Sequence, residues 1–314
     1  MRRLFSLLLA AALLLPAGCA PAAPAEEGEA RLSVVATTYP IYLLAREVIQ
    51  GVEGVEVERL NTGSVSCLHD YTLSVDDMKK LERADVVAVN GAGLEDFMSD
   101  ALASSDAAVI DCSEGVELLE NLSHDHAEGD EDHDHGHWDP HYWMDPRNAA
   151  EMAGNIARGL AQADPDHEGT YLSNLTRADT LLTSWDGELE AQLKEGAEIT
   201  GLITFHDGFQ YFAKAYGLPL LAAIEEEAGS EASAKEIVAI TRLVQERDIP
   251  VIFTEVNGSD ATANAIARET GCAVAQLTML MDGPEDGTLY DDYYAGLKDN
   301  VAAIVNGFAG EALQ

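Results

Sequence analysis

Short apolar runs alternate with helical stretches along most of the chain beyond residue 31. Eight runs have the length and composition of buried strands: Leu32–Ala36, Val55–Leu60, Asp85–Asn90, Ala107–Ile110, Thr200–Thr204, Leu218–Ile224, Pro250–Thr254 and Ala273–Leu277. Helical segments separate most of these runs, among them Ile41–Gln50, Val75–Ala84, Lys235–Glu246 and Ala261–Thr270. This alternation predicts an α/β fold made of βαβ units, with parallel sheets and right-handed crossovers.

A long helix is predicted between the two sets of strands. Asp164 suits its cap and Pro165 its first position. Large apolar residues recur at spacings near three, four or seven and form one face: Leu172, Leu175, Leu182, Trp185, Leu189 and Leu193. At ~1.5 Å per residue, about 28 residues reach roughly 42 Å. We expect two lobes, 31–163 and 196–314, joined by a rigid helix at 164–195; a surface helix within one domain is the alternative.

The first residues follow the order of a secretory signal. Two arginines precede the apolar run Leu4–Leu15, which is too short to span a bilayer well, and small residues follow as far as Cys19. The string Leu15-Pro16-Ala17-Gly18-Cys19 resembles a bacterial lipobox, with proline where leucine is typical. We expect a signal peptide at 1–19, lipidation of Cys19 and a flexible tether at 20–30, with the protein held outside the cytoplasm of a bacterium by its lipid anchor in the membrane. The alternative is an ordinary signal peptide with a chance cysteine.

Charge and cysteine content restrict the classes of partner and site. The 314 residues carry a formal net charge of −38. Nucleic acid is therefore not an expected partner, because phosphate binding needs a basic face. Such a field attracts cations, although acidity also serves solubility alone. Beyond Cys19 there are three cysteines, Cys67, Cys112 and Cys272, so at least one thiol stays unpaired in an oxidising compartment. No CxxC pair exists, which argues against a cysteine-rich zinc site.

Histidines are concentrated in one segment, 123–139, which reads SHDHAEGDEDHDHGHWD. It contains five of the nine histidines of the chain and seven acidic residues. Nothing in it can form a core, so a mobile loop is predicted. Its imidazoles form a candidate auxiliary metal site: His124, His126, His133, His135 and His137. A solvated acidic loop with incidental histidines is the alternative.

Three further histidines follow predicted strands. His69 lies nine residues past the second strand, His141 lies beyond the fourth, and His206 follows the fifth. Open α/β sheets bind ligands at the carboxyl ends of their strands, and imidazole suits Zn²⁺, so the three can converge between the lobes. A tetrahedral site needs one more ligand or a water. Glu255 and Asp282, which follow the seventh and eighth strands, are candidates for that position or for supporting the ligands.

The chain resembles the zinc/manganese substrate-binding lipoproteins of ABC importers from about residue 31 to 309. Five stretches carry the resemblance: TTYPIYLLAREV, CLHDYTLSVDDMKKLERADVVAVNGAGLEDF, HWDPHYWMDPRNA, ITFHDGFQYFAKAYGL and IPVIFTEV. It implies two α/β lobes joined by a rigid helix, with His69, His141 and His206 as metal ligands. Manganese members usually have glutamate at the third of these positions, so His206 implies the zinc branch. The acidic His-rich loop before the second ligand is also a feature of zinc members.

Two stretches depart from the family pattern. Cys67-Leu68-His69 stands where Asp-Pro-His is common, and Thr278 and Met279 occupy the neighbourhood of an aspartate that often supplies the fourth ligand. The fourth ligand therefore stays open between Glu255, Asp282 and Cys67.

The resulting hypothesis is a monomeric, non-enzymatic protein that captures Zn²⁺ as a transported ligand and delivers it to the permease of an ABC importer. Three alternatives remain: a manganese-specific member of the same family, a zinc-dependent hydrolase, and a metal-buffering adhesion protein. A hydrolase keeps an open metal position and adds a general base, and no HExxH motif is present.

Overall fold

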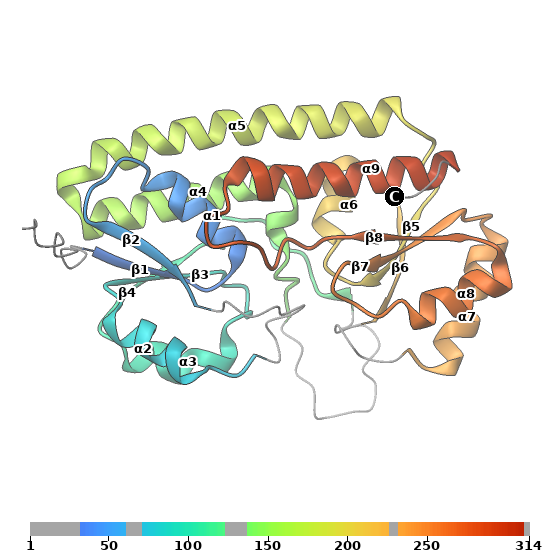
Figure 1. Ribbon diagram of the computed structural model, residues 1–314, viewed down its shortest axis with the longest axis horizontal. Coiled ribbons are helices and arrows are strands. Elements are labelled where there is room, and N and C mark those ends of the chain that lie inside the picture. The colour runs from blue at the N-terminus through green and yellow to red at the C-terminus, as the bar shows by residue number, and fades with distance from the viewer. Residues whose placement is uncertain (1–31, 61–70, 123–136, 226–231, 311–314) are drawn as a thin grey trace, which may run out of the picture.

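The computed structural model describes residues 32–60, 71–122, 137–225 and 232–310. Two four-stranded parallel sheets lie side by side, one in each half of the chain (Figure 1). The first contains β1 (Leu32–Ala36), β2 (Val55–Arg59), β3 (Val86–Val89) and β4 (Ala108–Asp111); the second contains β5 (Leu202–His206), β6 (Leu220–Glu225), β7 (Val251–Glu255) and β8 (Ala273–Leu277). The strand orders, β2-β1-β3-β4 and β6-β5-β7-β8, are equivalent, and the predicted α/β fold is confirmed. We call the two halves the N lobe and the C lobe.

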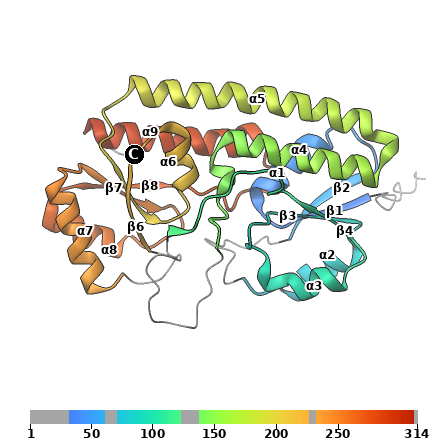
Figure 2. The same ribbon diagram turned by 180° about the vertical axis from the view of Figure 1, so that it is seen from behind.

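Helices cover both faces of each sheet (Figures 1 and 2). The α-helices are α1 (Tyr39–Val48), α2 (Val75–Arg83), α3 (Ser99–Ser104), α4 (Pro146–Ala163), α5 (Glu168–Glu195), α6 (Gln210–Tyr216), α7 (Ala234–Glu246), α8 (Ala261–Thr270) and α9 (Ala295–Ala309). The described residues also include the short helices η1 (Asp96–Met98), η3 (Tyr142–Met144) and η4 (Pro165–His167) and the π-helix η5 (Leu289–Tyr294). None of the helices in the described part of the chain is long and apolar enough to cross a membrane.

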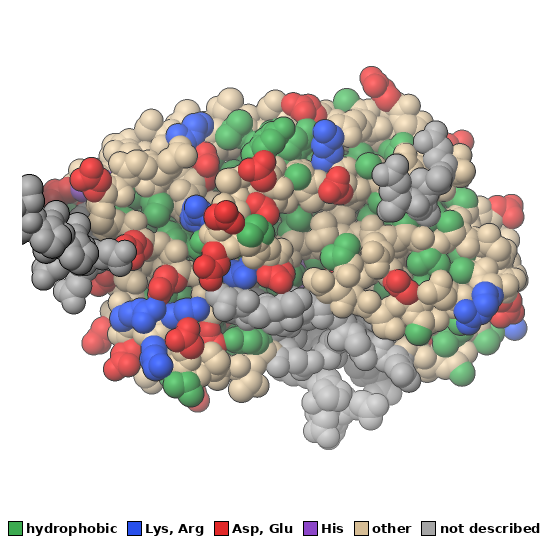
Figure 3. Space-filling view, in the orientation of Figure 1, with side chains coloured by type: hydrophobic (Ala, Val, Ile, Leu, Met, Phe, Trp, Pro, Cys, Tyr) green, Lys and Arg blue, Asp and Glu red, His purple; other side chains and the backbone are tan. Residues whose placement is uncertain are grey.

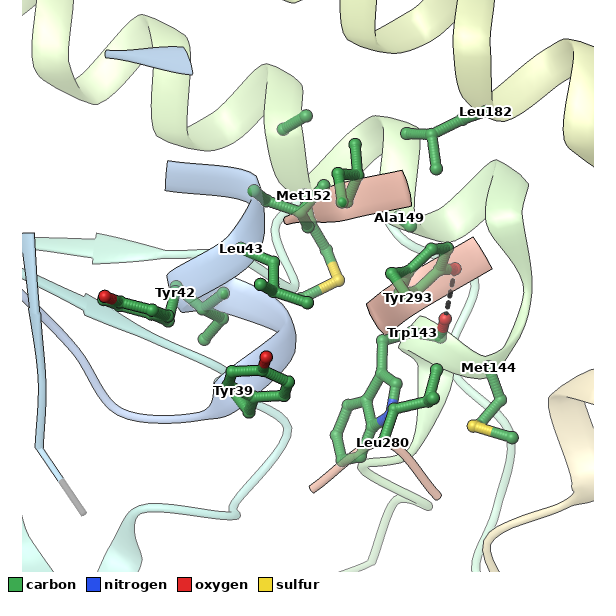
Figure 4. Close-up of a cluster of buried hydrophobic side chains, with 14 of the residues drawn as sticks. Tyr39, Tyr42, Leu43, Trp143, Met144, Ala149, Met152, Leu182, Leu280 and Tyr293 are labelled. Carbon is green, nitrogen blue, oxygen red and sulfur yellow. Dashed lines mark hydrogen bonds between the residues drawn. The ribbon is translucent and has the colours of Figure 1, made fainter. Parts of the chain in front are cut away.

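One apolar cluster is shared by both lobes. Val34 of β1 and Val251 of β7 belong to it, although they lie in different sheets. The next residues along these strands, Val35 and Ile252, point to the opposite faces of the sheets. Val35 belongs to a smaller cluster with residues of α2 and α3, and Ile252 belongs to another with residues of α7 and α8. Figure 4 shows part of the shared cluster, with side chains from α1, α4 and α5 packed together. The two sheets are therefore joined through a common core.

The long helix predicted between the strand sets is α5, with 28 residues. Four of the expected apolar positions, Leu182, Trp185, Leu189 and Leu193, are buried, but Leu172 is 40 % exposed and does not belong to that face. The predicted cap was also wrong: Pro165 opens the separate helix η4, and the Asp164 carboxylate accepts a hydrogen bond from the Tyr171 hydroxyl instead. Helix α5 packs along α4, which the sequence analysis did not anticipate.

Residues 279–288, which connect β8 to η5, run against the N lobe, and we call them the crossing segment. The hydroxyl of Tyr42 donates to the Glu285 carbonyl at 2.5 Å, and Arg46 donates to the Glu285 and Gly287 carbonyls at 2.8 and 2.7 Å. The Trp143 indole donates to the Met279 carbonyl at 2.9 Å. A connection of the C lobe is therefore held by α1 and η3 of the N lobe.

Candidate metal centre

His206 is the last residue of β5. The strand ends two residues later than the sequence pattern predicts. The His206 side chain is 3 % exposed. The backbone N–H of Gly208 donates to Nδ1 at 3.1 Å, and an oxygen of the Asp207 carboxylate lies 3.1 Å from the same nitrogen. Metal binding through Nε2 requires the tautomer in which Nδ1 carries the proton, and this proton would be donated to Asp207 in place of the bond that Nδ1 accepts from Gly208. A carboxylate in this position fixes the ring and raises the basicity of the ligating nitrogen.

His141 lies in the connection between β4 and α4, immediately before η3, and is 2 % exposed. Its Nδ1 lies 2.8 Å from Asp139 Oδ1, which also accepts from the His141 backbone at 2.9 Å. Gln210 and Tyr211 of α6 bind the same aspartate, through Oδ2 at 3.0 Å and the main-chain carbonyl at 2.8 Å. The aspartate thus holds the imidazole with Nε2 turned away from it. Asp139 was not identified from the sequence as a functional residue, although it stands in the stretch HWDPH.

The two buried imidazoles face each other across the lobes. Their ring centroids are 5.1 Å apart and their planes are inclined by 85°. A zinc ion held at about 2.0–2.1 Å from Nε2 lies about 3.2 Å from each ring centroid, and a tetrahedral angle then separates the centroids by about 5 Å. The observed spacing of 5.1 Å is therefore compatible with two imidazole ligands of one Zn²⁺.

The other candidate ligands named from the sequence do not lie with His141 and His206 in the same way. His69 and Cys67 lie outside the described residues. Glu255 ends β7 and is buried; Thr204 pairs with Phe253, so His206 and Glu255 end neighbouring strands. Asp282 lies in the crossing segment, where its carboxylate forms an ion pair with Arg59 at 3.1 Å. Within the described ranges, no group of three or more His, Cys, Asp or Glu side chains is arranged to hold a metal ion.

Of the five histidines in the candidate auxiliary loop, four lie outside the described residues: His124, His126, His133 and His135. The fifth, His137, is exposed and packs edge-on against Trp138, with ring centroids 4.4 Å apart. Trp138 bridges to Glu120, which ties this end of the loop to the segment before it. Cys112 is buried and Cys272 is partly buried, and both are free thiols. Cys19 also lies outside the described residues.

Another buried carboxyl group, that of Glu95, lies at the strand ends of the N lobe. It accepts hydrogen bonds from the Thr37 hydroxyl at 2.5 Å and from the backbone nitrogens of Asn90 and Gly91 at 2.7 and 3.0 Å. Burial raises the pKa of Glu95 to about 7, against the lowering effect of these three bonds. Its partners come from the ends of β1 and β3, so it holds these two strand ends together.

Comparison with known proteins identifies relatives over most of the chain. The family model described as ZnuA, zinc-uptake complex component A periplasmic, matches residues 34–307. The zinc-binding protein AdcA of Streptococcus pyogenes is 28% identical over 298 residues, which cover 88% of this chain and 56% of that protein. The chain thus spans little more than half the length of AdcA. The metal ABC transporter substrate-binding lipoprotein ScbA of Streptococcus cristatus is 26% identical over 320 residues, 98% of each chain.

A solved structure of a related protein has the same fold. The laminin-binding protein Lmb of Streptococcus agalactiae, an adhesin with metal-transporting activity, superposes with a TM-score of 0.74. It is 27% identical, and the superposition covers 87% of this chain and 99% of Lmb. The two-lobed arrangement is therefore shared with a protein of similar length to the described region.

Proposed function

The chain belongs to the ZnuA family, the periplasmic component A of zinc-uptake complexes, and from that membership we propose that it captures Zn²⁺ outside the cytoplasm and delivers it to the permease of an ABC importer. The family consists of non-enzymatic solute-binding proteins, which confirms that the chain is not an enzyme. Metal capture without chemistry requires a closed set of ligands and a means of release, rather than an open metal position beside a general base.

The observation that carries the proposal is the pair formed by His141 and His206. They come from different lobes, are almost fully buried, and stand at a separation that is compatible with one tetrahedral Zn²⁺ between them. His69 completes the proposed ligand set as a third imidazole. A change in the relative position of the lobes would separate His141 from His206, which supplies a route for release to the permease.

The donor set supports Zn²⁺ over Mn²⁺. Imidazole nitrogen suits zinc, whereas manganese is better served by carboxylate, carbonyl and water oxygens. Asp139 and Asp207 face Nδ1 of the two rings, so these carboxylates serve the imidazoles and are not themselves directed to the metal. Asp282 is committed to Arg59, and we propose that it is not the fourth ligand.

Two further elements of the proposal concern how the protein works at the cell surface. ScbA is a substrate-binding lipoprotein of a metal ABC transporter, which supports a permease partner and a lipid anchor, here at Cys19. The acidic, His-rich segment at 123–139 would bind additional Zn²⁺ more weakly than the buried pair and supply it to His141, which follows His137 after three residues. Deletion of residues 124–137 should remove weak zinc binding in calorimetry and preserve the tight site.

The proposal is tested by metal analysis of protein purified without chelator, followed by competition with a fluorescent zinc chelator. One tightly bound Zn²⁺ is expected, and Mn²⁺ should not displace it at equal concentration. His141→Ala and His206→Ala should each weaken Zn²⁺ binding by well over tenfold, since each removes one of about four metal ligands.

His167→Ala is the matched control for these variants. His167 also pairs with an aspartate, Asp164, at 3.0 Å, but it is 36 % exposed in its side chain and lies in η4 at the start of the long helix. It should leave the zinc affinity unchanged. Equal affinities in all three histidine variants would show that the metal binds elsewhere and would overturn the proposed function.

A further inference from the structure

Helix α6 of the C lobe begins four residues after His206, and its first residue reaches the carboxylate that pairs with His141. The side-chain amide of Gln210 donates to Asp139 Oδ2 at 3.0 Å and to the Glu120 carbonyl at 3.2 Å. The other carboxylate oxygen, Oδ1, accepts from the His141 backbone at 2.9 Å and lies 2.8 Å from Nδ1 of that residue. The two oxygens of one aspartate thus contact one residue from each lobe.

The aspartate belongs to a short antiparallel pair of segments, 119–121 and 137–139, which we call the stem. Within the stem, the backbone nitrogen of Asp139 donates to the Leu119 carbonyl at 2.8 Å. The hydroxyl of Tyr211, the second residue of α6, accepts from the Leu119 backbone nitrogen and donates to the Asp139 carbonyl, both at 2.8 Å. Helix α6 of the C lobe therefore binds both segments of the stem.

The first two residues of α6 bind different parts of the stem. Tyr211 binds main-chain groups, which fixes the course of the two segments. Gln210 binds the carboxylate of Asp139, which fixes the plane of that group. Asp139 is 2 % exposed, so the donor that sets this plane has to come from the protein. A carboxylate orients a histidine ligand through a hydrogen bond, and the direction of that bond follows the carboxylate plane.

We propose that Gln210 is a positioning residue of the metal site, which holds the Asp139 carboxylate from the C lobe and thereby orients the imidazole of His141. This inference rests on the proposed function and adds a residue that acts through Asp139. Gln210 and His206 belong to the same lobe, so the orientation of one ligand depends on the position of the lobe that carries the other. Separation of the lobes would remove this support as it parts the imidazoles, which favours rapid release of the metal.

The test compares Gln210→Met with Gln210→Glu. Methionine is similar in length but donates no hydrogen bond, and glutamate has the same shape but places a carboxylate against that of Asp139. The three side chains have similar helix propensities, so α6 should persist in both variants. Gln210→Met should weaken Zn²⁺ binding by about tenfold and Gln210→Glu by up to about a hundredfold, the range for groups that support metal ligands. Chelator competition measures the affinity, and a chelator chase should show that most of the loss lies in faster dissociation.

Lys214→Met is the matched control. Lys214 lies one turn further along α6 and donates to the Glu117 carboxylate at 2.9 Å, so its removal also breaks a bond between the lobes but leaves Asp139 untouched. Because this ion pair is exposed, the variant should keep the parental zinc affinity. A spectroscopic readout separates positioning from general stability. With Co²⁺ in the site, the visible spectrum of Lys214→Met should match the parent, whereas that of Gln210→Glu should change because the His141 ligand has moved.

The outcomes separate this inference from the proposed function. An unchanged zinc affinity and an unchanged Co²⁺ spectrum in both Gln210 variants would overturn the role of Gln210, while the histidine variants could still lose Zn²⁺. An equal loss of affinity in Lys214→Met would also overturn it, because any bond between α6 and the N lobe would then serve. If His141→Ala and His206→Ala leave Zn²⁺ binding intact, the proposed site itself fails, and the inference fails with it.

Discussion

β1 and β5 occupy equivalent places in their sheets, yet the residues at their carboxyl ends have different roles. After β1, the hydroxyl of Thr37 donates to Glu95, and Thr38 caps α1. β5 instead ends in His206, which faces His141 of the other lobe. Both lobes thus bury polar groups at the same edge of the sheet. In the N lobe they bind one another, and in the C lobe His206 packs against the His141 ring, its proposed partner in zinc binding.

This difference is consistent with the proposal that the ligand of the N lobe, His141, comes from a connection and not from the end of a central strand. At the ends of that lobe's central strands, β1 and β3, the polar groups already donate hydrogen bonds to the Glu95 carboxylate. A ligand must then come from further along the chain, from the segment that precedes α4. The comparison predicts that variants at the N-lobe strand ends alter stability, whereas variants at the C-lobe strand ends alter metal affinity.

The largest effect is expected for Glu95→Ala. It leaves a hydroxyl and two backbone nitrogens buried without their acceptor, which should lower the free energy of unfolding by about 4 kcal/mol. Urea unfolding followed by tryptophan fluorescence measures the loss. Glu95→Gln keeps one acceptor oxygen and should lose much less, with unchanged zinc affinity. A zinc affinity that falls tenfold in Glu95→Gln would break the distinction between the lobes.

The pH dependence of stability provides the next test. Because burial raises the pKa of Glu95 to about 7 from its usual value of 4.5, the folded state retains a proton between these pH values that the unfolded state releases. The unfolding free energy of the metal-free protein should therefore fall as pH rises through this window, by about 3 kcal/mol relative to Glu95→Gln. Parallel curves for the two proteins between pH 4.5 and 7.5 would contradict the assignment.

A smaller effect is expected at the ion pair between the lobes. Arg59 also lies over the ring of Tyr39, with 4.9 Å from its guanidinium carbon to the ring centroid. Asp282→Ala leaves this buried guanidinium unpaired, but the carboxylate is 28% exposed, so the expected loss is about 2 kcal/mol. Thermal unfolding measures it, and zinc titration should give the parental affinity. A zinc affinity reduced more than tenfold would instead identify Asp282 as a ligand.

The smallest effects are expected at the N-caps of two equivalent helices. Ser74 of α2 and Ser233 of α7 each form a capping box, in equivalent helices of the two lobes. In the N lobe the partner Asp77 is buried and also binds the Tyr71 hydroxyl, whereas Glu236 is exposed. Ser74→Ala should cost about 1 kcal/mol and Ser233→Ala about 0.5 kcal/mol in urea unfolding. The reverse order would show that local burial does not set the strength of these caps.

Strands were predicted well because parallel strands buried on both faces form continuous apolar runs. Leu32–Ala36 and Ala273–Leu277 have the expected bounds. Helix α4 was not expected, because its buried face consists largely of small residues such as Ala149, Ala153 and Gly154, which give a weak apolar signal. The proposed ligand pair was predicted from strand ends and family motifs, and the structure brings His141 and His206 together. The role of His69 remains a prediction.

The immediate surroundings of the imidazoles were less accessible to sequence reasoning. Asp139 is close to His141 in sequence, and the pairing of a histidine ligand with a nearby carboxylate could have indicated it. Met279 reaches the same place across more than 130 positions of the chain, through its carbonyl bond to Trp143. No local pattern encodes a contact of that range, because it depends on how the crossing segment runs between the lobes.

The crossing segment also has a consequence for the order in which the molecule acquires its structure. The hydroxyl of Tyr39, in the first helix, bonds the carbonyl of Pro284, 245 positions later. A chain that emerges progressively during synthesis therefore cannot finish the packing of its first helix until Pro284 has emerged. Contacts between residues so far apart in the sequence slow folding, because a large loop must close before they can form. Helix α1 should consequently gain its full protection from hydrogen exchange only late in refolding, together with α9.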